Sequence, residues 1–195
     1  MSGKSNLCIS GVVALAALLS VCASPLLAQS IEEKTQVCAG CHGADGKPVD
    51  KTIPTLWGQQ AGYIYIELRD FKRGDRKSDI MQPIASLLER QDMLDIGEYF
   101  SKKPWPDLGQ PRASKDFAAR AVSANQSIGC TGCHLDHFQG DGTVPRLAGM
   151  GRDYLAKQMT DFRSRARGNN PGMSDLMLAT SPDDLAALAE YLSGL

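Results

Sequence analysis

The chain has 195 residues, and its 21 Lys and Arg nearly balance its 22 Asp and Glu, which leaves a formal net charge of −1. This balance gives no indication of nucleic-acid binding, for which a basic surplus would be expected. Only 6% of the residues are aromatic, so a core built from side chains alone would give little stability to a small domain. We therefore expect another large apolar body to complete the core.

The first 28 residues have the pattern of a secretory signal peptide. Lys4 is their only charged residue, and the apolar run that follows suits a signal peptide better than a membrane span, which needs about 20 apolar residues. We predict cleavage after Ala28. Cleavage after Ala23, lipidation at Cys22 and retention as an uncleaved anchor are the alternatives. The mature protein is therefore expected in the periplasm.

Two copies of the pentapeptide Cys-x-x-Cys-His lie 92 residues apart, at 38–42 and 130–134. This pentapeptide is the attachment signature of c-type haem, in which two thiols one helical turn apart bond to the two vinyl groups. The predicted attachment residues are Cys38, Cys41, Cys130 and Cys133. The histidine after each pair is placed to ligate the iron, so we predict two covalent haem c groups with His42 and His134 as proximal ligands.

Three helices are predicted in the first half, at about 31–38, 62–72 and 93–100. The last two follow from apolar residues at helical spacing. Met81 lies between them and is predicted to ligate the iron on the side opposite His42, where a thioether raises the reduction potential. Gly97 is expected to let the last helix approach another closely.

The segment that joins the halves contains Pro104, Pro106 and Pro111. These prolines cannot continue a helix and favour an extended, fairly stiff connector. The predicted domains are 29–103 and 115–195, joined by the linker 104–114. Trp105 is expected to pack in the groove between the two domains.

Three helices are also predicted in the second half, at about 115–127, 152–165 and 182–192. The last has the clearest start, because Ser181 suits the N-cap, Pro182 the first helical position, and Asp184 completes a capping box.

The second iron has two candidate methionine ligands. Met173 is our choice and Met177, four residues later, is the rival. His137 lies too close to His134 to reach the opposite side of the same haem, so we expect it at the surface or in contact with a haem edge.

The halves repeat along most of their length. Proline, leucine, glycine, tyrosine and phenylalanine recur at an offset of 91 residues, and the first cysteine of each pentapeptide precedes its methionine by 43 residues in both halves. The matched residues are Pro54 and Pro145, Leu56 and Leu147, Gly58 and Gly149, Tyr63 and Tyr154, and Phe71 and Phe162. Two equivalent folding units are therefore predicted, each around one haem.

Two basic clusters also take matching places in the repeat. They comprise Lys72, Arg73, Arg76 and Lys77 in the first half and Arg163, Arg165 and Arg167 in the second. Each cluster is read as a solvated loop, a surface that steers an acidic partner, or a partner of haem propionates. The sequence leaves these three interpretations open.

Each half resembles a class I cytochrome c domain, and the whole is similar to the dihaem cytochrome c4 family. The first half carries the resemblance at 41–46, 53–56, 71–74 and 81–84. In the second half the sequence 135–138 replaces the usual glycine-rich run, and Asp175 stands opposite Pro83. The resemblance implies an all-α fold, with two tandem class I domains related by a pseudo-twofold axis and haems near their interface.

The predicted function is one-electron transfer between a respiratory donor and an acceptor, with no substrate site. The resemblance implies redox partners such as quinol–cytochrome c reductase, a haem-copper terminal oxidase or a dehydrogenase, with peripheral membrane association as an option. The alternative is the haem subunit of a flavocytochrome c of the sulfide dehydrogenase type. A dihaem peroxidase or thiosulfate-oxidising enzyme fits less well, because each half offers a methionine ligand and no spare cysteine remains in the mature chain.

Overall fold

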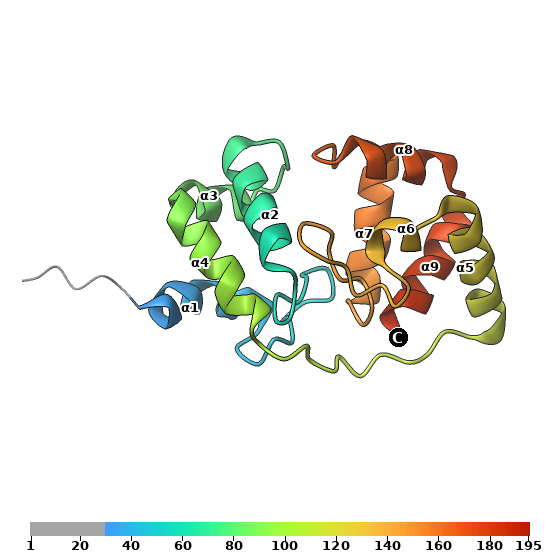
Figure 1. Cartoon of the computed structure of the whole chain (residues 1–195), viewed down its shortest axis with the longest axis horizontal. Coiled ribbons are helices and arrows are strands. Elements are labelled where there is room, and N and C mark those ends of the chain that lie inside the picture. Colours follow the sequence, from blue (N-terminus) through green and yellow to red (C-terminus); the bar gives the residue numbers. More distant parts are fainter. Residues whose placement is uncertain (1–29) are drawn as a thin grey trace, which may run out of the picture.

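The computed structural model describes residues 30–195, so the predicted signal peptide lies outside the described residues. The described chain is mainly helical, which confirms the all-α prediction, and Figure 1 shows two halves side by side. The helices are α1 (Ile31–His42), α2 (Ala61–Arg73), α3 (Met81–Ser86), α4 (Arg90–Ser101), α5 (Lys115–Ile128), α6 (Thr131–His134), α7 (Arg152–Arg163), α8 (Pro171–Ala179) and α9 (Pro182–Ser193). Within residues 30–195 an isolated bridge between Asp141 and Val144 is the only β-pairing, and no helix there is long and apolar enough to cross a membrane.

Helix α1 is longer than predicted, because it continues through the whole first pentapeptide. A capping box fixes its start: Ser30 Oγ accepts a hydrogen bond from the Glu33 N–H (3.2 Å), and the Glu33 carboxylate accepts one from the Ser30 N–H (3.0 Å). The helix ends at Gly43, whose φ of 87° favours glycine. His42 therefore lies on the last turn of a helix that is fixed at both ends.

Helices α2 and α4 form the core of the first half. Its buried members are Ile64, Leu68, Met93, Ile96 and Phe100. As predicted, Gly97 allows a close approach, since a Cβ at that position would lie 2.6 Å from the carbonyl oxygen of Ala61 on α2. The short helix α3 was not predicted, and it begins at Met81.

The core of the second half extends over α5, α7 and α9, where Ala187 and Leu188 are almost fully buried. At the start of α9, Pro182 takes the first helical turn and Ser181 Oγ accepts a hydrogen bond from the Asp184 N–H (3.1 Å), as predicted. The expected return bond to the Ser181 N–H is replaced, because the Ser181 hydroxyl itself donates to the Asp184 carboxylate (2.6 Å).

The segment between α4 and α5 contains no helix and runs along both halves (Figure 1). Trp105 on this segment lies where the halves meet. A Cβ at Gly58 would be 3.1 Å from the Trp105 backbone nitrogen, and a Cβ at Gly149 would be 2.8 Å from its Nε1. The predicted position of Trp105 between the halves is therefore confirmed.

Backbone contacts repeat between the halves in the same way as the sequence. The Gly58 N–H donates to the carbonyl oxygen of Phe100, and the Gly149 N–H donates to that of Leu192, both at 2.9 Å. In each half, this bond joins the loop after the attachment helix to the end of the last long helix. The sequence repeat is thus a structural repeat, with two copies of one helical unit related by a pseudo-twofold axis.

Candidate functional site

The first pentapeptide lies on the last turns of α1. Cys38 is partly buried against the first-half core and Cys41 is exposed, whereas His42 is buried. His42 Nδ1 lies 2.8 Å from the carbonyl oxygen of Pro54. Because a carbonyl can only accept, this bond places the proton on Nδ1 and leaves the Nε2 lone pair for a metal ion.

The second pentapeptide has the same geometry although its helix is interrupted. Gly129, with φ of 79°, ends α5, and the short helix α6 carries His134. Cys130 is partly buried and Cys133 is exposed, as in the first half. His134 Nδ1 lies 2.9 Å from the carbonyl oxygen of Pro145. Both histidines are therefore held in the same tautomer by a proline carbonyl.

Burial controls the protonation of these side chains. It lowers the pKa of His42 and of His134, against a smaller opposite effect of their carbonyl hydrogen bonds. Both imidazoles are therefore neutral at pH 7, which is the form that binds a metal ion. Burial also raises the pKa of the Cys38 and Cys130 thiols, so the fold by itself does not make them reactive thiolates.

Met81 and Met173 occupy equivalent positions. The Met81 N–H donates to Ser78 Oγ at the start of α3, and the Met173 N–H donates to Asn170 Oδ1 in the first turn of α8, both at 3.1 Å. Both methionines are partly buried, and each packs against the core cluster that also holds the first attachment cysteine of its half. The fold therefore brings each predicted thioether ligand to the same core as its attachment site.

The rival ligand Met177 has a different environment. It lies one turn after Met173 on α8 and is only 3% exposed within the second-half core. A side chain packed in this way is a core residue. The partial burial of Met173 matches that of Met81 and favours Met173 as the ligand, which stays a prediction.

Residues beside the second histidine fit the anionic propionates of a haem. Trp105 Nε1 is buried and has no hydrogen-bond partner within residues 30–195. The Arg146 guanidinium lies 4.5 Å from the Trp105 ring centroid, and burial lowers the pKa of Arg146. In the described chain this guanidinium donates to the Ala148 carbonyl (3.0 Å) and meets no acid. Trp105 and Arg146 thus offer two hydrogen-bond donors that have no acid partner in the described chain and could bind haem propionates. Together with the cysteine pair and the methionine of this half, they fit a haem c group.

His137 is exposed in the loop after α6, as predicted. Sequence reasoning gave no role to Pro54 and Pro145, although it matched them in the repeat. The available signal was the spacing, since these prolines follow the motif histidines by 12 and 11 residues. A matched proline at that spacing provides the carbonyl that orients each motif histidine.

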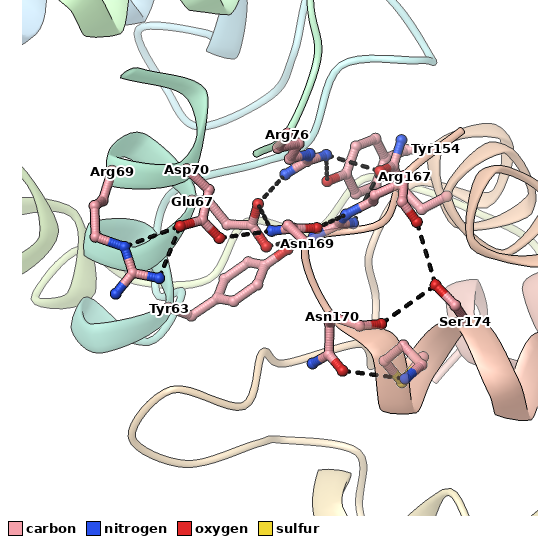
Figure 2. A network of polar contacts seen from close by, with 12 residues as sticks. Tyr63, Glu67, Arg69, Asp70, Arg76, Tyr154, Arg167, Asn169, Asn170 and Ser174 are labelled. Carbon is pink, nitrogen blue, oxygen red and sulfur yellow. Dashed lines mark hydrogen bonds and ion pairs between the residues drawn. The ribbon is translucent and has the colours of Figure 1, made fainter. Parts of the chain in front are cut away.

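The two basic clusters divide into exposed and buried members. Lys77 is exposed in the loop after α2, so the solvated-loop interpretation applies to it, whereas Lys72 lies exposed on the last turn of α2 and donates to the Leu88 carbonyl. Arg76 and Arg167 are buried in a polar network between the halves (Figure 2). Sequence reasoning missed this network, and the matching offset of Arg76 and Arg167 was the only signal for it.

Comparisons with known proteins agree with this geometry. The family described as "Cytochrome c" matches residues 33–102. The chain is 33% identical over 180 residues to "Cytochrome c4" of Azotobacter vinelandii, with 83% of this chain and 86% of the relative covered. It is also 33% identical to "Thiosulfate dehydrogenase electron acceptor" of Stutzerimonas stutzeri, with 96% of this chain and 94% of the relative covered.

A solved structure is similar over the same length. The crystal structure of reduced recombinant cytochrome c4 from Pseudomonas stutzeri superposes with a TM-score of 0.73 at 30% sequence identity. The superposition covers 86% of this chain and 100% of that structure. The likeness therefore extends over both halves and is not confined to one attachment motif.

Proposed function

The chain belongs to the cytochrome c4 family, and from this premise we propose that it is a dihaem electron carrier of the periplasm. Membership of the family implies covalently bound haem c. We further propose that the chain carries two such haems. The proposed attachment residues are Cys38, Cys41, Cys130 and Cys133, and the proposed axial ligands are His42, Met81, His134 and Met173.

One observation carries this proposal: both motif histidines have the same hydrogen bond to a proline carbonyl, at 2.8 Å from Pro54 and 2.9 Å from Pro145. The bond leaves the Nε2 lone pair of each imidazole free for a haem iron, and Met81 and Met173 would be available as the second ligand in each half. A bound haem supplies the reversible ferric–ferrous couple, and a methionine ligand raises its reduction potential. Two occupied axial positions leave no place for a substrate, so these residues favour a carrier over an enzyme.

The proposed partners are redox proteins on either side of the carrier. Quinol–cytochrome c reductase or a dehydrogenase would donate, and a haem-copper oxidase would accept. The relative named as an electron acceptor of thiosulfate dehydrogenase, which matches 96% of this chain, supports a dehydrogenase as donor. A signal peptide at 1–28 would deliver the chain to the compartment where these partners work.

The carrier proposal is tested with the purified holoprotein. Pyridine haemochrome absorbance and intact mass should both give two covalent haems per chain. The oxidised protein should show the charge-transfer band of methionine-ligated ferric iron at the strength of two haems. Lack of this band would show that methionine does not ligate the ferric iron, and rapid turnover of hydrogen peroxide would require an iron with an open axial position, so either result would contradict the proposal.

The haem subunit of a flavocytochrome c is the second candidate. Two exposed apolar side chains favour it, because Ile80 and Leu87 flank the Met81 helix and are 68% and 82% exposed. A permanent partner would bury such residues, whereas a transient one need not. Purification from the native membrane-free extract should give the chain alone if it is a carrier, and a stoichiometric flavoprotein complex if it is a subunit.

A further inference from the structure

A network of polar side chains joins α2 of the first half to α7, and to the segment after α7, in the second half (Figure 2). Four of its charged members, Glu67, Asp70, Arg76 and Arg167, are only 2–9% exposed. Charged side chains are almost never buried to this degree unless they are paired. The seam between the halves therefore depends on how these charges are matched.

Much of the network follows the pseudo-twofold axis. Arg76 Nη2 donates to the Tyr154 hydroxyl (3.3 Å), and Arg167 Nη2 donates to the Tyr63 hydroxyl (3.2 Å). Each guanidinium also lies over a phenylalanine ring of its own half, at 4.6 Å and 4.3 Å from the ring centroid. The two arginines thus cross the seam reciprocally.

The symmetry is broken at one pair of positions, because the counterpart of Glu67 is Gln158. Both arginines bind both residues. Arg76 donates to Glu67 Oε2 and to Gln158 Oε1, at 2.7 Å each. Arg167 donates to Gln158 Oε1 (2.9 Å) and to Glu67 Oε1. A single carboxylate therefore lies between two cations, with a neutral amide at the symmetric place.

Asn169 of the second half adds two more contacts across the seam. Its Nδ2 donates to Glu67 Oε2 (3.2 Å) and to Asp70 Oδ2 (2.9 Å). Arg69 holds the other oxygen of Asp70 at 2.7 Å. The buried acids of the network thus belong to the first half, while the second half contributes donors that reach them.

Charge matching makes Glu67 the central member. Among residues 30–195, Glu67 is the only acid that forms ion pairs with Arg76 and Arg167. Removal of one partner from a buried ion pair leaves an uncompensated charge and is strongly destabilising. Loss of the Glu67 carboxylate would leave two such arginines facing each other across the seam.

We propose that Glu67 is a positioning residue whose carboxylate clamps the two halves in the fixed orientation through which electrons pass between the haems. The inference rests on the proposed dihaem function. In this proposal the orientation of the two halves depends on one carboxylate near their pseudo-twofold axis, which has no charged counterpart in the second half.

The test begins with Glu67→Gln, which keeps the shape of the side chain and removes its charge. The holoprotein variant should retain two haems and show a larger radius of gyration by small-angle X-ray scattering. Redistribution of an injected electron between the haems, followed after pulse radiolysis, should slow by about tenfold or more, since processes that need a fixed geometry fall steeply with small displacements.

Two further variants separate the clamp from a general effect of charge. Glu98→Gln removes one exposed carboxylate, which pairs with Lys102 on the surface of α4, and should leave both readouts unchanged. The exchange variant Glu67→Gln/Gln158→Glu moves the carboxylate to the symmetric place, where both arginines still reach it. It should regain the compact scattering profile and most of the redistribution rate.

Three outcomes would overturn the clamp. The first is a Glu67→Gln variant with the same radius of gyration and redistribution rate as Glu98→Gln. The second is an exchange variant with the same enlarged radius and slowed rate as Glu67→Gln, and the third is an exchange variant that fails to fold. If Glu67→Gln alone yields no folded protein, a folded and compact exchange variant supports the clamp. If the wild-type chain carries fewer than two haems, the proposed dihaem function is contradicted. The comparison of radii of gyration still tests whether Glu67 holds the two halves together.

Discussion

The two halves share one backbone conformation at three turns where the first half has glycine and the second does not. The pairs are Gly43 and Leu135, Gly46 and Phe138, and Gly74 and Arg165, and all six residues have φ between 52° and 87°. A residue with a Cβ is strained at such a positive φ by about 1–3 kcal/mol, and it persists only where the surrounding structure determines it. The second half therefore keeps the conformation of these three turns against local strain.

One of these replacements is compensated by packing. A Cβ at Gly46 would lie 2.7 Å from the Trp57 ring. In the second half the counterpart of Trp57 is Ala148, and the counterpart of Gly46 is Phe138, which is only 4% exposed. The large aromatic side chain is therefore at the Trp57 position in the first half and at the position equivalent to Gly46 in the second. The same space in the two cores is thus filled by an aromatic side chain from a different position in each half. Cores tolerate such an exchange when the total side-chain volume is kept.

Met173→Ala should have the largest functional effect, because it removes the proposed axial ligand of the second iron. We expect loss of about half of the charge-transfer absorption and a lower value for one of two reduction potentials. Met81→Ala should remove the other half. Both are measured on oxidised holoprotein by absorbance and by potentiometric titration.

Met177→Ala is the matched control within α8. It should leave the band intact and lower the free energy of unfolding by about 2–5 kcal/mol, as expected for a buried methionine. If Met177→Ala loses the band and Met173→Ala keeps it, the ligand assignment of the second half is wrong.

Phe138→Ala should give the largest loss of stability outside the ligands, about 3–5 kcal/mol, because it leaves a cavity in the second-half core. Urea unfolding of the holoprotein, followed by circular dichroism, measures it. The double variant Phe138→Gly/Ala148→Trp rebuilds the first-half arrangement and should be more stable than Phe138→Gly alone. A double variant that is no more stable would show that the two cores are not interchangeable.

Arg165→Gly should stabilise the second half by about 1 kcal/mol, since glycine removes the strain of positive φ. The lost ion pair with Asp175 is exposed, and such pairs contribute about 0–1 kcal/mol. Gly74→Ala is the reciprocal change and should destabilise, because the φ of 81° at this position strains a residue with a Cβ, although that Cβ would meet only Gln82 Nε2, at 3.6 Å. Thermal unfolding measures both, and a destabilised Arg165→Gly protein would contradict the strain assigned to this turn.

The smallest effect is expected from Asp92→Asn. The Lys34 ammonium binds Asp92 at 2.6 Å and ties α1 to α4. This hydrogen bond holds the pKa of Asp92 below its usual range. A lowered pKa stabilises the fold above the unfolded value, near pH 3.9, and this contribution is lost as the pH falls through the folded value.

Asp92→Asn should therefore weaken the fold slightly at pH 7 and flatten the loss of stability below about pH 4. In the second half Arg120 binds Asp184 at 2.7 Å between α5 and α9, but the first cause of the low pKa of Asp184 is its bond from Ser181. Asp184→Asn is the comparison. Unfolding midpoints measured from pH 2 to pH 7 would contradict the assignment if the Asp92→Asn profile matched that of the wild type.

Local patterns in the sequence were sufficient to predict most of the helices, and they also carry the predicted attachment sites, which stay a prediction. Apolar spacing located α2 and α9, and Gly97 was correctly expected at a close helix contact. Helix α3 was missed because six residues with one proline show no helical period, and the end of α1 was predicted four residues too early, because the helix continues through the motif as far as His42. The distinction between Met173 and Met177 needed their burial, which spacing does not give.

The sequence by itself determined the two Cys-x-x-Cys-His motifs, the repeat and the matching place of Met81 and Met173 within it, because these features depend on residue type and on spacing. Tertiary structure alone decided that Arg76 and Arg167 converge on Glu67, although Arg167 lies 100 residues from Glu67 in sequence. It also decided that Phe138 replaces Trp57 in the core. Such contacts depend on how the helices pack in the folded protein. A local sequence pattern does not specify which side chains from distant parts of the chain come into contact there.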